Sequence, residues 1–227
     1  EMEEAFMKQK IQALILESAY MAKDYSFENE VPNRPNGLAL SKWIKKEIKE
    51  IDAEIDALEE KHGLISVCTK GCAECCKQCI VVLASECIAI QMYIDNLPVE
   101  QRNALKAKVI ETCSLLEKDG FNKDSVANCF MGETAQRAIQ EKYFKLNRNC
   151  VFLDDENCCM IHDIRPSLCW SYREYEDKGI CRNSCFSDTS IKYDDWERRY
   201  SLRLIEARPT KKKLMILPFA VREIINW

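Results

Sequence analysis

The clearest hydrophobic pattern in the chain runs from Ser41 to Leu58. Apolar side chains recur there at steps of three and four residues: Trp43, Ile44, Ile48, Ile51, Ile55 and Leu58. The positions between them are mainly lysine, glutamate and aspartate, so the segment predicts an amphipathic helix with one buried face. We expect Ser41 to cap its N-terminus, because a serine hydroxyl accepts a hydrogen bond from a free N–H of the first turn.

Less regular patterns predict further helices over 4–21, 85–94, 99–116, 134–146, 194–207 and 214–227. In the first of these we expect Phe6, Ile11, Leu14 and Ile15 on the buried side. Strand patterns are scarce, and between 150 and 185 the helical periodicity fails. The expected fold class is mainly α, a helical protein with an irregular cysteine-rich metal-binding core. We divide the chain into an N-terminal helical segment (1–63), a cysteine-cluster metal-binding domain (64–187) and a C-terminal helical tail (188–227).

The composition is that of an ordinary globular protein. With 227 residues, a net charge of −4 and 47% hydrophobic residues, the chain can bury a core without disulfide bridges. It contains no apolar run of about 18 residues, so no membrane span is expected. The first residues are acidic and show no signal-peptide pattern, which predicts a reducing, cytoplasmic setting. Arg208 and the three lysines at 211–213 form the only dense basic run, interpreted as a solvated linker, so nucleic acid is not an expected partner.

The cysteines change this picture most. Cys68, Cys72, Cys75 and Cys76 place four thiols within nine residues, and a second thiol-rich stretch spans 150–185. Thiolates are soft ligands suited to zinc and iron–sulfur clusters, and disulfides are the rival explanation. The expected metal ligands are eight: Cys68, Cys72, Cys75, Cys76, Cys150, Cys159, Cys169 and Cys185. Eight is twice four, which indicates two sites or clusters, with one site plus spare thiols as the alternative.

The adjacent pair Cys75–Cys76 bears on the kind of metal. Neighbouring side chains diverge along an extended backbone, so we expect these two thiols to serve different metals or to bridge two. Such a pair suits a polynuclear site, and the chain has only two histidines. We therefore favour an iron–sulfur cluster such as 4Fe-4S, and zinc stays open as the alternative.

The other thiols are weaker candidates: Cys79, Cys87, Cys113, Cys129, Cys158 and Cys181. Cys87 and Cys113 fall within helical patterns, where a buried cysteine packs as a small hydrophobe. Cys79, Cys158 and Cys181 flank the clusters, and each remains a substitute for a ligand in the set of eight.

Three residues with nitrogen side chains lie beside the predicted ligands. His62 is interpreted as a helix-end partner of the dipole. His162 follows Cys159 by three residues and is expected to support the ligands rather than bind metal, with ligation as the alternative. Arg165 is the predicted cofactor-binding residue, since its guanidinium would offset the excess negative charge of four thiolates, and a surface ion pair is the competing interpretation.

The ordered pattern resembles the YkgJ-like cysteine-cluster family, a CxxCxxCC domain described as zinc- or iron-chelating. The resemblance rests on Cys68-x3-Cys72-x2-Cys75-Cys76, a helix with an acidic start near Glu86, Cys150-Val-Phe-Leu-Asp, and the segment from Cys159 through Arg165-Pro166 to Cys169. It covers about half the chain. The first gap is three residues where the family name implies two. The resemblance implies metal or iron–sulfur binding, and the family includes flagellin lysine N-methylases.

The first three thiols also have the spacing by which radical S-adenosylmethionine enzymes hold a cluster. The chain lacks the alternating strands and helices of their barrels, which argues against that class. The sequence thus predicts a metal-binding, redox-active protein. The alternatives are a structural zinc module, a metal carrier or a cluster-dependent enzyme such as a lysine N-methylase. Metal ions are the expected partners, with a partner protein as a further expectation for a structural module.

Overall fold

The computed structural model describes residues 2–27, 30–32, 37–69, 71–126, 133–207 and 214–224. Within these ranges the fold is mainly α, which confirms the predicted class. The helices are α1 (Met2–Asp24), α2 (Gly37–Lys61), α3 (Ala84–Asp95), α4 (Val99–Lys118), α5 (Glu133–Phe144), α6 (Ser167–Trp170), α7 (Lys178–Asn183), α8 (Asp194–Ala207) and α9 (Leu217–Ile224). The basic run at 208–213 and Cys129 lie outside the described residues.

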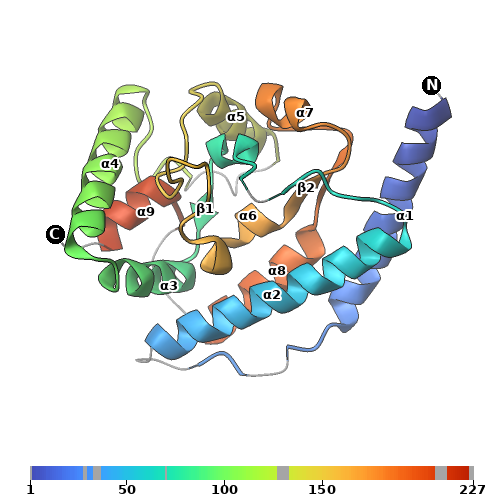
Figure 1. The fold of residues 1–227 in the computed structure, drawn as a ribbon, viewed down its shortest axis with the longest axis horizontal. Helices are drawn as coiled ribbons and strands as arrows, with labels where there is room; N and C mark the ends of the chain where they lie inside the picture. The colour runs from blue at the N-terminus through green and yellow to red at the C-terminus, as the bar shows by residue number, and fades with distance from the viewer. Residues whose placement is uncertain are drawn as a thin grey trace.

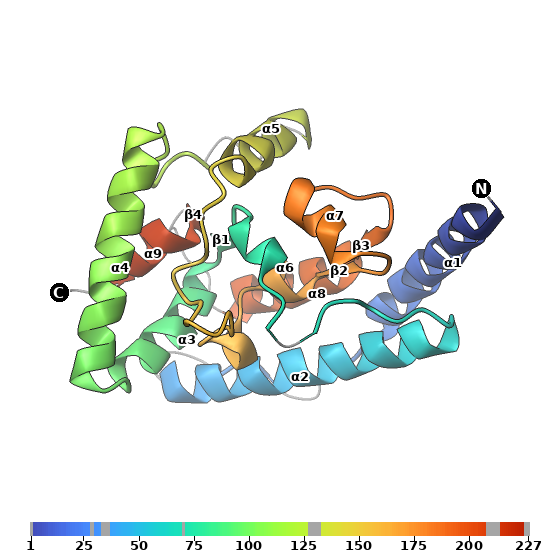
Figure 2. The same ribbon diagram turned by 45° about the horizontal axis from the view of Figure 1, so that its top comes forward.

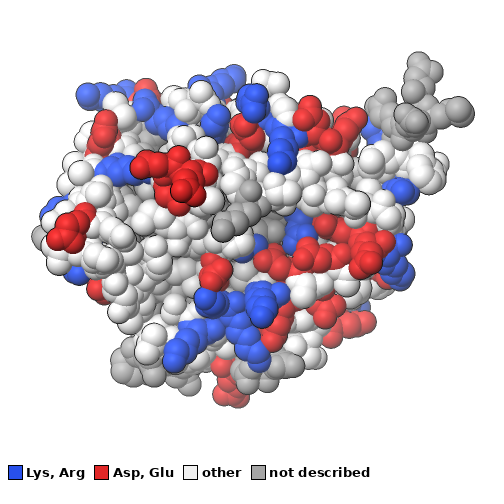
Figure 3. Space-filling view, in the orientation of Figure 1, with Lys and Arg blue, Asp and Glu red and all other residues white. Residues whose placement is uncertain are grey.

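Helix α2 shows the predicted amphipathic pattern and packs against α3 along one side of the molecule (Figure 1). All six predicted apolar residues of its stripe are buried. The helix begins at Gly37, so Ser41 lies inside it and the predicted N-cap is wrong. Figure 3 shows basic side chains over the first half of α2 and acidic ones over its second half. The acidic half meets Arg165 and Arg173, whose guanidinium groups both pair with Asp52.

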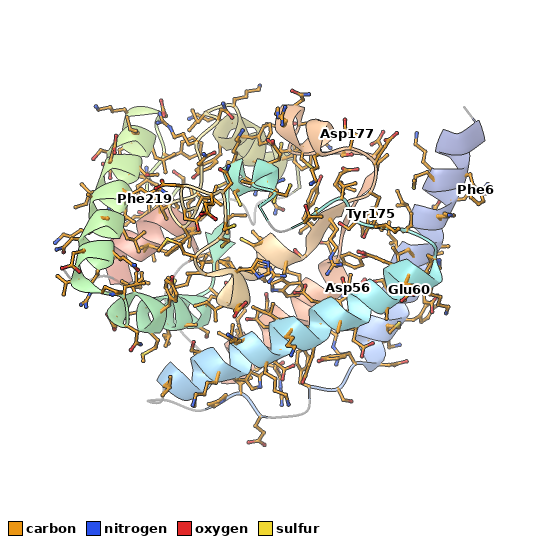
Figure 4. The ribbon with its side chains drawn as sticks, viewed as in Figure 1. Phe6, Asp56, Glu60, Tyr175, Asp177 and Phe219 are labelled. Carbon is orange, nitrogen blue, oxygen red and sulfur yellow. The ribbon has the colours of Figure 1, made fainter. Side chains whose placement is uncertain are left out.

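Helix α1 lies against α8 at the edge of the molecule. Ile11 and Leu14 are buried, as predicted, and Trp196 of α8 donates a hydrogen bond of 3.0 Å to Ser18. The predicted burial of Phe6 and Ile15 is wrong, since these side chains are 60% and 45% exposed. Figure 4 shows Phe6 pointing away from the rest of the molecule. The buried face of α1 is therefore rotated from the face that apolar spacing alone predicts.

In the described ranges, two short two-stranded antiparallel sheets join distant parts of the chain. Strand β1 (Val81–Val82) pairs with β4 (Met215–Ile216), which brings the C-terminal α9 against α3 and α4. Strand β2 (Tyr172–Glu174) pairs with β3 (Ser190–Lys192), with Arg173 opposite Ile191. The buried residues form one hydrophobic core drawn from all three predicted segments. No helix in the described ranges is long and apolar enough to cross a membrane.

Candidate metal centre

The cysteine-bearing segments meet around one short 3₁₀ helix, η1 (Glu74–Lys77), which carries Cys75 and Cys76. Figures 1 and 2 show η1 with α7 on one side and the loop that follows residue 150 on the other. Helix α7 packs against η1, and Arg182 of α7 donates a hydrogen bond of 2.8 Å to Glu74. Thiols that are about 75 to 110 positions apart in the sequence are therefore neighbours in the fold.

The first cysteine loop is held by backbone hydrogen bonds rather than by a hydrophobic stripe. The N–H of Val67 donates to the carbonyl of Glu174 at 2.9 Å, which fixes the loop to the β2 strand. Gly71 has φ +83°, a left-handed conformation that favours glycine, and the N–H of Cys72 donates to the carbonyl of Thr69 at 2.9 Å. The chain then enters η1, so this turn sets where Cys75 and Cys76 lie.

Apolar side chains anchor the second cysteine loop, residues 150–159, in the hydrophobic core. Val151 and Phe152 are fully buried, and a backbone hydrogen bond of 2.9 Å joins Met160 to Phe152. Cys150 and Cys159 thus lie on one small bridged loop. Cys169 is carried by α6, as the sequence predicts. Glu86 of α3 holds that helix in place, because its Oε1 accepts the N–H of Ser167 at 2.7 Å.

The thiols of the two clusters lie near enough to shift one another's pKa. Burial raises the pKa of Cys150 to about 12 and that of Cys181 to about 12, and the charge of Cys75 adds to both shifts. Burial and then neighbouring thiols, Cys75 among them, also raise the pKa of Cys159 and Cys169. Cys75 therefore has thiols of the second cluster near it, from the loop after 150, from α6 and from α7.

By the neighbours that shift their pKa values, seven thiols fall into two groups near Cys75, which is the eighth. Cys76, Cys150, Cys159 and Cys169 form the first group. Cys68, Cys72 and Cys181 form the second. Seven of these eight belong to the predicted ligand set, so the structure brings together most of the thiols that the sequence singles out.

The structure does not place Cys185 with this group. Its pKa is raised first by burial and then by Glu141, and is lowered by Arg137 and Lys145, with no thiol among its main neighbours. It faces a cavity that Cys79 also lines. Cys181, four residues earlier in the chain, lies near Cys68 and Cys75 instead. Both cysteines follow Cys169 within 16 residues. The spacing in the sequence therefore gives no reason to choose one rather than the other as a ligand.

The adjacent cysteines differ from the prediction. Their backbone is a 3₁₀ helix rather than extended chain. The interaction between the two thiols lowers the pKa of Cys75 and raises the pKa of Cys76. The extended backbone assumed for this pair is therefore wrong, and the two thiols interact with each other.

Two cations lie near the first group of thiols. Arg165 lowers the pKa of Cys75, Cys159 and Cys169 and also forms an ion pair of 2.6 Å with Asp52. Arg165 is thus both near the thiols and in an ion pair, which is largely buried rather than on the surface, and its role as a cofactor-binding residue stays a prediction. Lys108, which the sequence did not single out, donates a hydrogen bond of 2.6 Å to the carbonyl of Leu153 and lowers the pKa of Cys150.

The histidines lie at the edge of this arrangement. His62 is at the end of α2, and its Nε2 lies 2.9 Å from a carboxylate oxygen of Glu17 in α1. It therefore links two helices. The side chain of His162 is 64% exposed, and its Nδ1 lies 3.4 Å from a guanidinium nitrogen of Arg165. His162 therefore contacts Arg165, and its supporting role beside the ligands stays a prediction.

The donor set fits a soft metal ion, but its present geometry is open. Every described cysteine is a free thiol. Within the described ranges, no three His, Cys, Asp or Glu side chains are arranged to hold one metal ion. Metal binding by these thiols would require their deprotonation, and it is coupled to the folding of the site that holds them. The thiols are thus near Cys75, but they are not arranged as the ligands of a single metal ion.

No protein-family model, no curated protein and no solved structure matches the chain. The resemblance to the YkgJ-like family therefore stays a prediction that rests on the cysteine pattern alone.

Proposed function

We propose that the protein binds metal through the eight thiols gathered around Cys75, as one or more iron–sulfur clusters or as zinc. The observation that carries the proposal is the convergence of two distant cysteine clusters on η1. Seven thiols of the predicted set take part, and Cys181 takes the place of Cys185 as the eighth. Thiol chemistry suits both kinds of centre.

The surroundings of the thiols support this proposal. A group of thiolates with a metal centre carries excess negative charge, and Arg165 and Lys108 supply positive charge on the side of Cys150, Cys159 and Cys169. When bound, an iron–sulfur centre would supply one-electron redox chemistry. The chain's own contribution is to hold the thiols and to place the two cations near them. A reducing, cytoplasmic setting is part of this proposal.

The test is anaerobic purification followed by measurement of iron, zinc and acid-labile sulfide, with a visible spectrum of the same sample. Iron with matching sulfide and a broad visible band supports a redox-active cluster. Stoichiometric zinc without colour supports a structural zinc module or a metal carrier. Cys75→Ser should lose most of the metal, whereas Cys113→Ala, a thiol buried in α4 away from the group, should keep it. Wild-type protein free of both metals under these conditions would refute the proposal.

A further inference from the structure

A cavity of about 470 Å³ lies between α5, β2, β3 and the residues that follow η1, and its lining cysteines are Cys79 and Cys185 rather than any of the eight gathered thiols. Leu168, the neighbour of Cys169, lines it, and so does Tyr172, whose pKa is raised by burial first and then by charges that include Cys181 and Cys75. The volume is within the range of ordinary small-molecule sites. The cavity is therefore large enough for a ligand and close to the proposed metal centre.

One cation on the cavity wall is arranged to receive an anion. The guanidinium of Arg137 lies over the ring of Phe186, 4.3 Å from its centroid, which fixes its plane. In the described part of the chain its guanidinium has one hydrogen-bonding partner, the carboxylate of Glu141, which lies 3.3 Å from Nε in an ion pair, and its side chain is 58% exposed. The two terminal nitrogens remain for a ligand, and a guanidinium edge matches a carboxylate or phosphate in a two-point contact.

The second cation of the cavity, Lys192, is paired with two carboxylates. It lies 2.5 Å from Asp194 and 3.3 Å from Glu197. The same pairing occupies Asp194, so the cavity does not offer a free carboxylate to a cation. Among the described residues Arg137 pairs with one carboxylate and only through Nε, so its two terminal nitrogens are the cationic donors of the cavity.

Uncharged polar groups complete the wall. The buried hydroxyl of Tyr172 makes no hydrogen bond with any described residue, although Ser190 is near enough to lower its pKa. The side-chain amides of Gln78 and Gln136 have no hydrogen-bond partner among the described residues either. Gln140, by contrast, holds the backbone of Cys79 with bonds of 3.2 Å and 3.0 Å and forms a fixed part of the wall. A buried hydroxyl without a partner is costly, and a polar ligand would satisfy it.

A second cavity of similar size, about 480 Å³, lacks this combination. It lies between α3, β4 and α9, and its lysine, Lys123, pairs with Glu223 at 3.4 Å. Cys87 lines it, and none of the eight gathered thiols lines either cavity. The first cavity is the better candidate because the two terminal nitrogens of Arg137 make no hydrogen bond with a described residue and the buried hydroxyl of Tyr172 has no described partner.

We propose that the first cavity binds a small organic anion, with its carboxylate or phosphate on Arg137 and its body between Tyr172, Gln78 and Gln136. Binding of this anion does not require the metal proposal to hold. If the metal centre is present, the anion lies next to it and is the candidate substrate or effector of that centre.

The experiment measures binding of benzoate, phenyl phosphate and neutral benzamide to the purified full chain by isothermal titration calorimetry, with metal content recorded for each sample. We expect one of the two anions to bind and benzamide to bind at least tenfold more weakly. Preference for benzoate identifies a carboxylate ligand, and preference for phenyl phosphate identifies a phosphate. A charged hydrogen bond contributes roughly 1.5–3 kcal/mol, so Arg137→Gln should weaken anion binding about tenfold to a hundredfold.

Two further variants separate a specific site from a general effect of charge. Tyr172→Phe removes only the buried hydroxyl and should weaken binding several-fold. Arg198→Gln removes an exposed arginine of α8 that pairs with Asp195, and its binding should equal that of wild type. The proposal is overturned if neither anion binds, if benzamide binds as well as the anions, or if Arg137→Gln has no effect or no more effect than Arg198→Gln. Each of these outcomes leaves the metal content, and so the metal proposal, to be judged separately.

Discussion

Glu86 provides a sharp test of the contacts that position Cys169. Its side chain is 1% exposed, and its two oxygens accept the backbone N–H groups of Leu83 at 2.8 Å and Ser167 at 2.7 Å. Burial raises the pKa of Glu86 to about 7 from an ordinary value of 4.5, and these two hydrogen bonds only partly oppose the shift. The carboxylate is thus more easily ionised in the unfolded chain than in the folded protein.

The sign of the pH dependence follows from this difference. Below pH 4.5 the group is neutral in both states, so it carries no ionisation penalty. Between pH 4.5 and 7 the unfolded chain loses the proton while the folded protein keeps it, so the free energy of unfolding falls as the pH rises. Each pH unit is worth about 1.4 kcal/mol, and the difference of about 2.5 units gives a total loss of about 3 kcal/mol. Above pH 7 the loss is complete.

Glu86→Gln should remove this dependence. The amide accepts one backbone N–H and sets its own NH₂ against the other, which costs about 1–3 kcal/mol at all pH values. Urea unfolding of both proteins at pH 5, 6, 7 and 8 gives the difference in unfolding free energy, in which other titrating groups cancel. We expect the difference in unfolding free energy between wild type and Glu86→Gln to shrink by about 2.5 kcal/mol from pH 5 to 8, because part of the loss is already present at pH 5. For Glu60→Gln, on the exposed face of α2, the free energy of unfolding should change with pH as it does for wild type. Parallel curves for Glu86→Gln would refute the reasoning.

Three further substitutions test the packing around the site, each by urea unfolding. Arg173→Gln should lower the free energy of unfolding by about 3 kcal/mol, because it leaves the buried Glu59 without the cation that lies 3.2 Å from it, while Asp52 keeps its pair with Arg165. Tyr175→Phe should cost about 1 kcal/mol, since it removes a 2.6 Å hydrogen bond to the buried Glu59. Ile51→Ala should cost 2–5 kcal/mol, in the range of large-to-small core changes, because Ile51 is fully buried in α2. A loss below about 0.5 kcal/mol in any of them would contradict the contact concerned.

The sequence predicts the features that depend on local repetition. The stripe of α2 from Trp43 to Leu58 needs only the helical period, and the structure buries all of it. The buried side of α1 was predicted only in part, because its partner α8 follows about 170 residues later and selects which face is covered. Phe6 and Ile15 are apolar at helical spacing, yet they lie on the other side of that contact.

The candidate site shows the same division. Spacing identified seven of the eight gathered thiols because the two clusters are dense in the sequence. It could not choose Cys181 over Cys185, since only the packing of α7 on η1 separates them. Nor could it find the pairing of Arg165 with Asp52, which are 113 positions apart. The 3₁₀ turn at Cys75–Cys76 depends on the preceding glycine turn and on tertiary contacts, and spacing carries no information about either.

The most direct test of the central claim compares the metal content of Cys181→Ser and Cys185→Ser, purified anaerobically beside wild type. Both substitutions remove a buried thiol in the same part of the chain, so each is the control for the other. Thermal unfolding of both variants checks that the fold is kept. The account predicts that Cys181→Ser loses metal, while Cys185→Ser keeps the wild-type stoichiometry. Loss of metal in Cys185→Ser with full retention in Cys181→Ser, or full retention in both, would contradict the account.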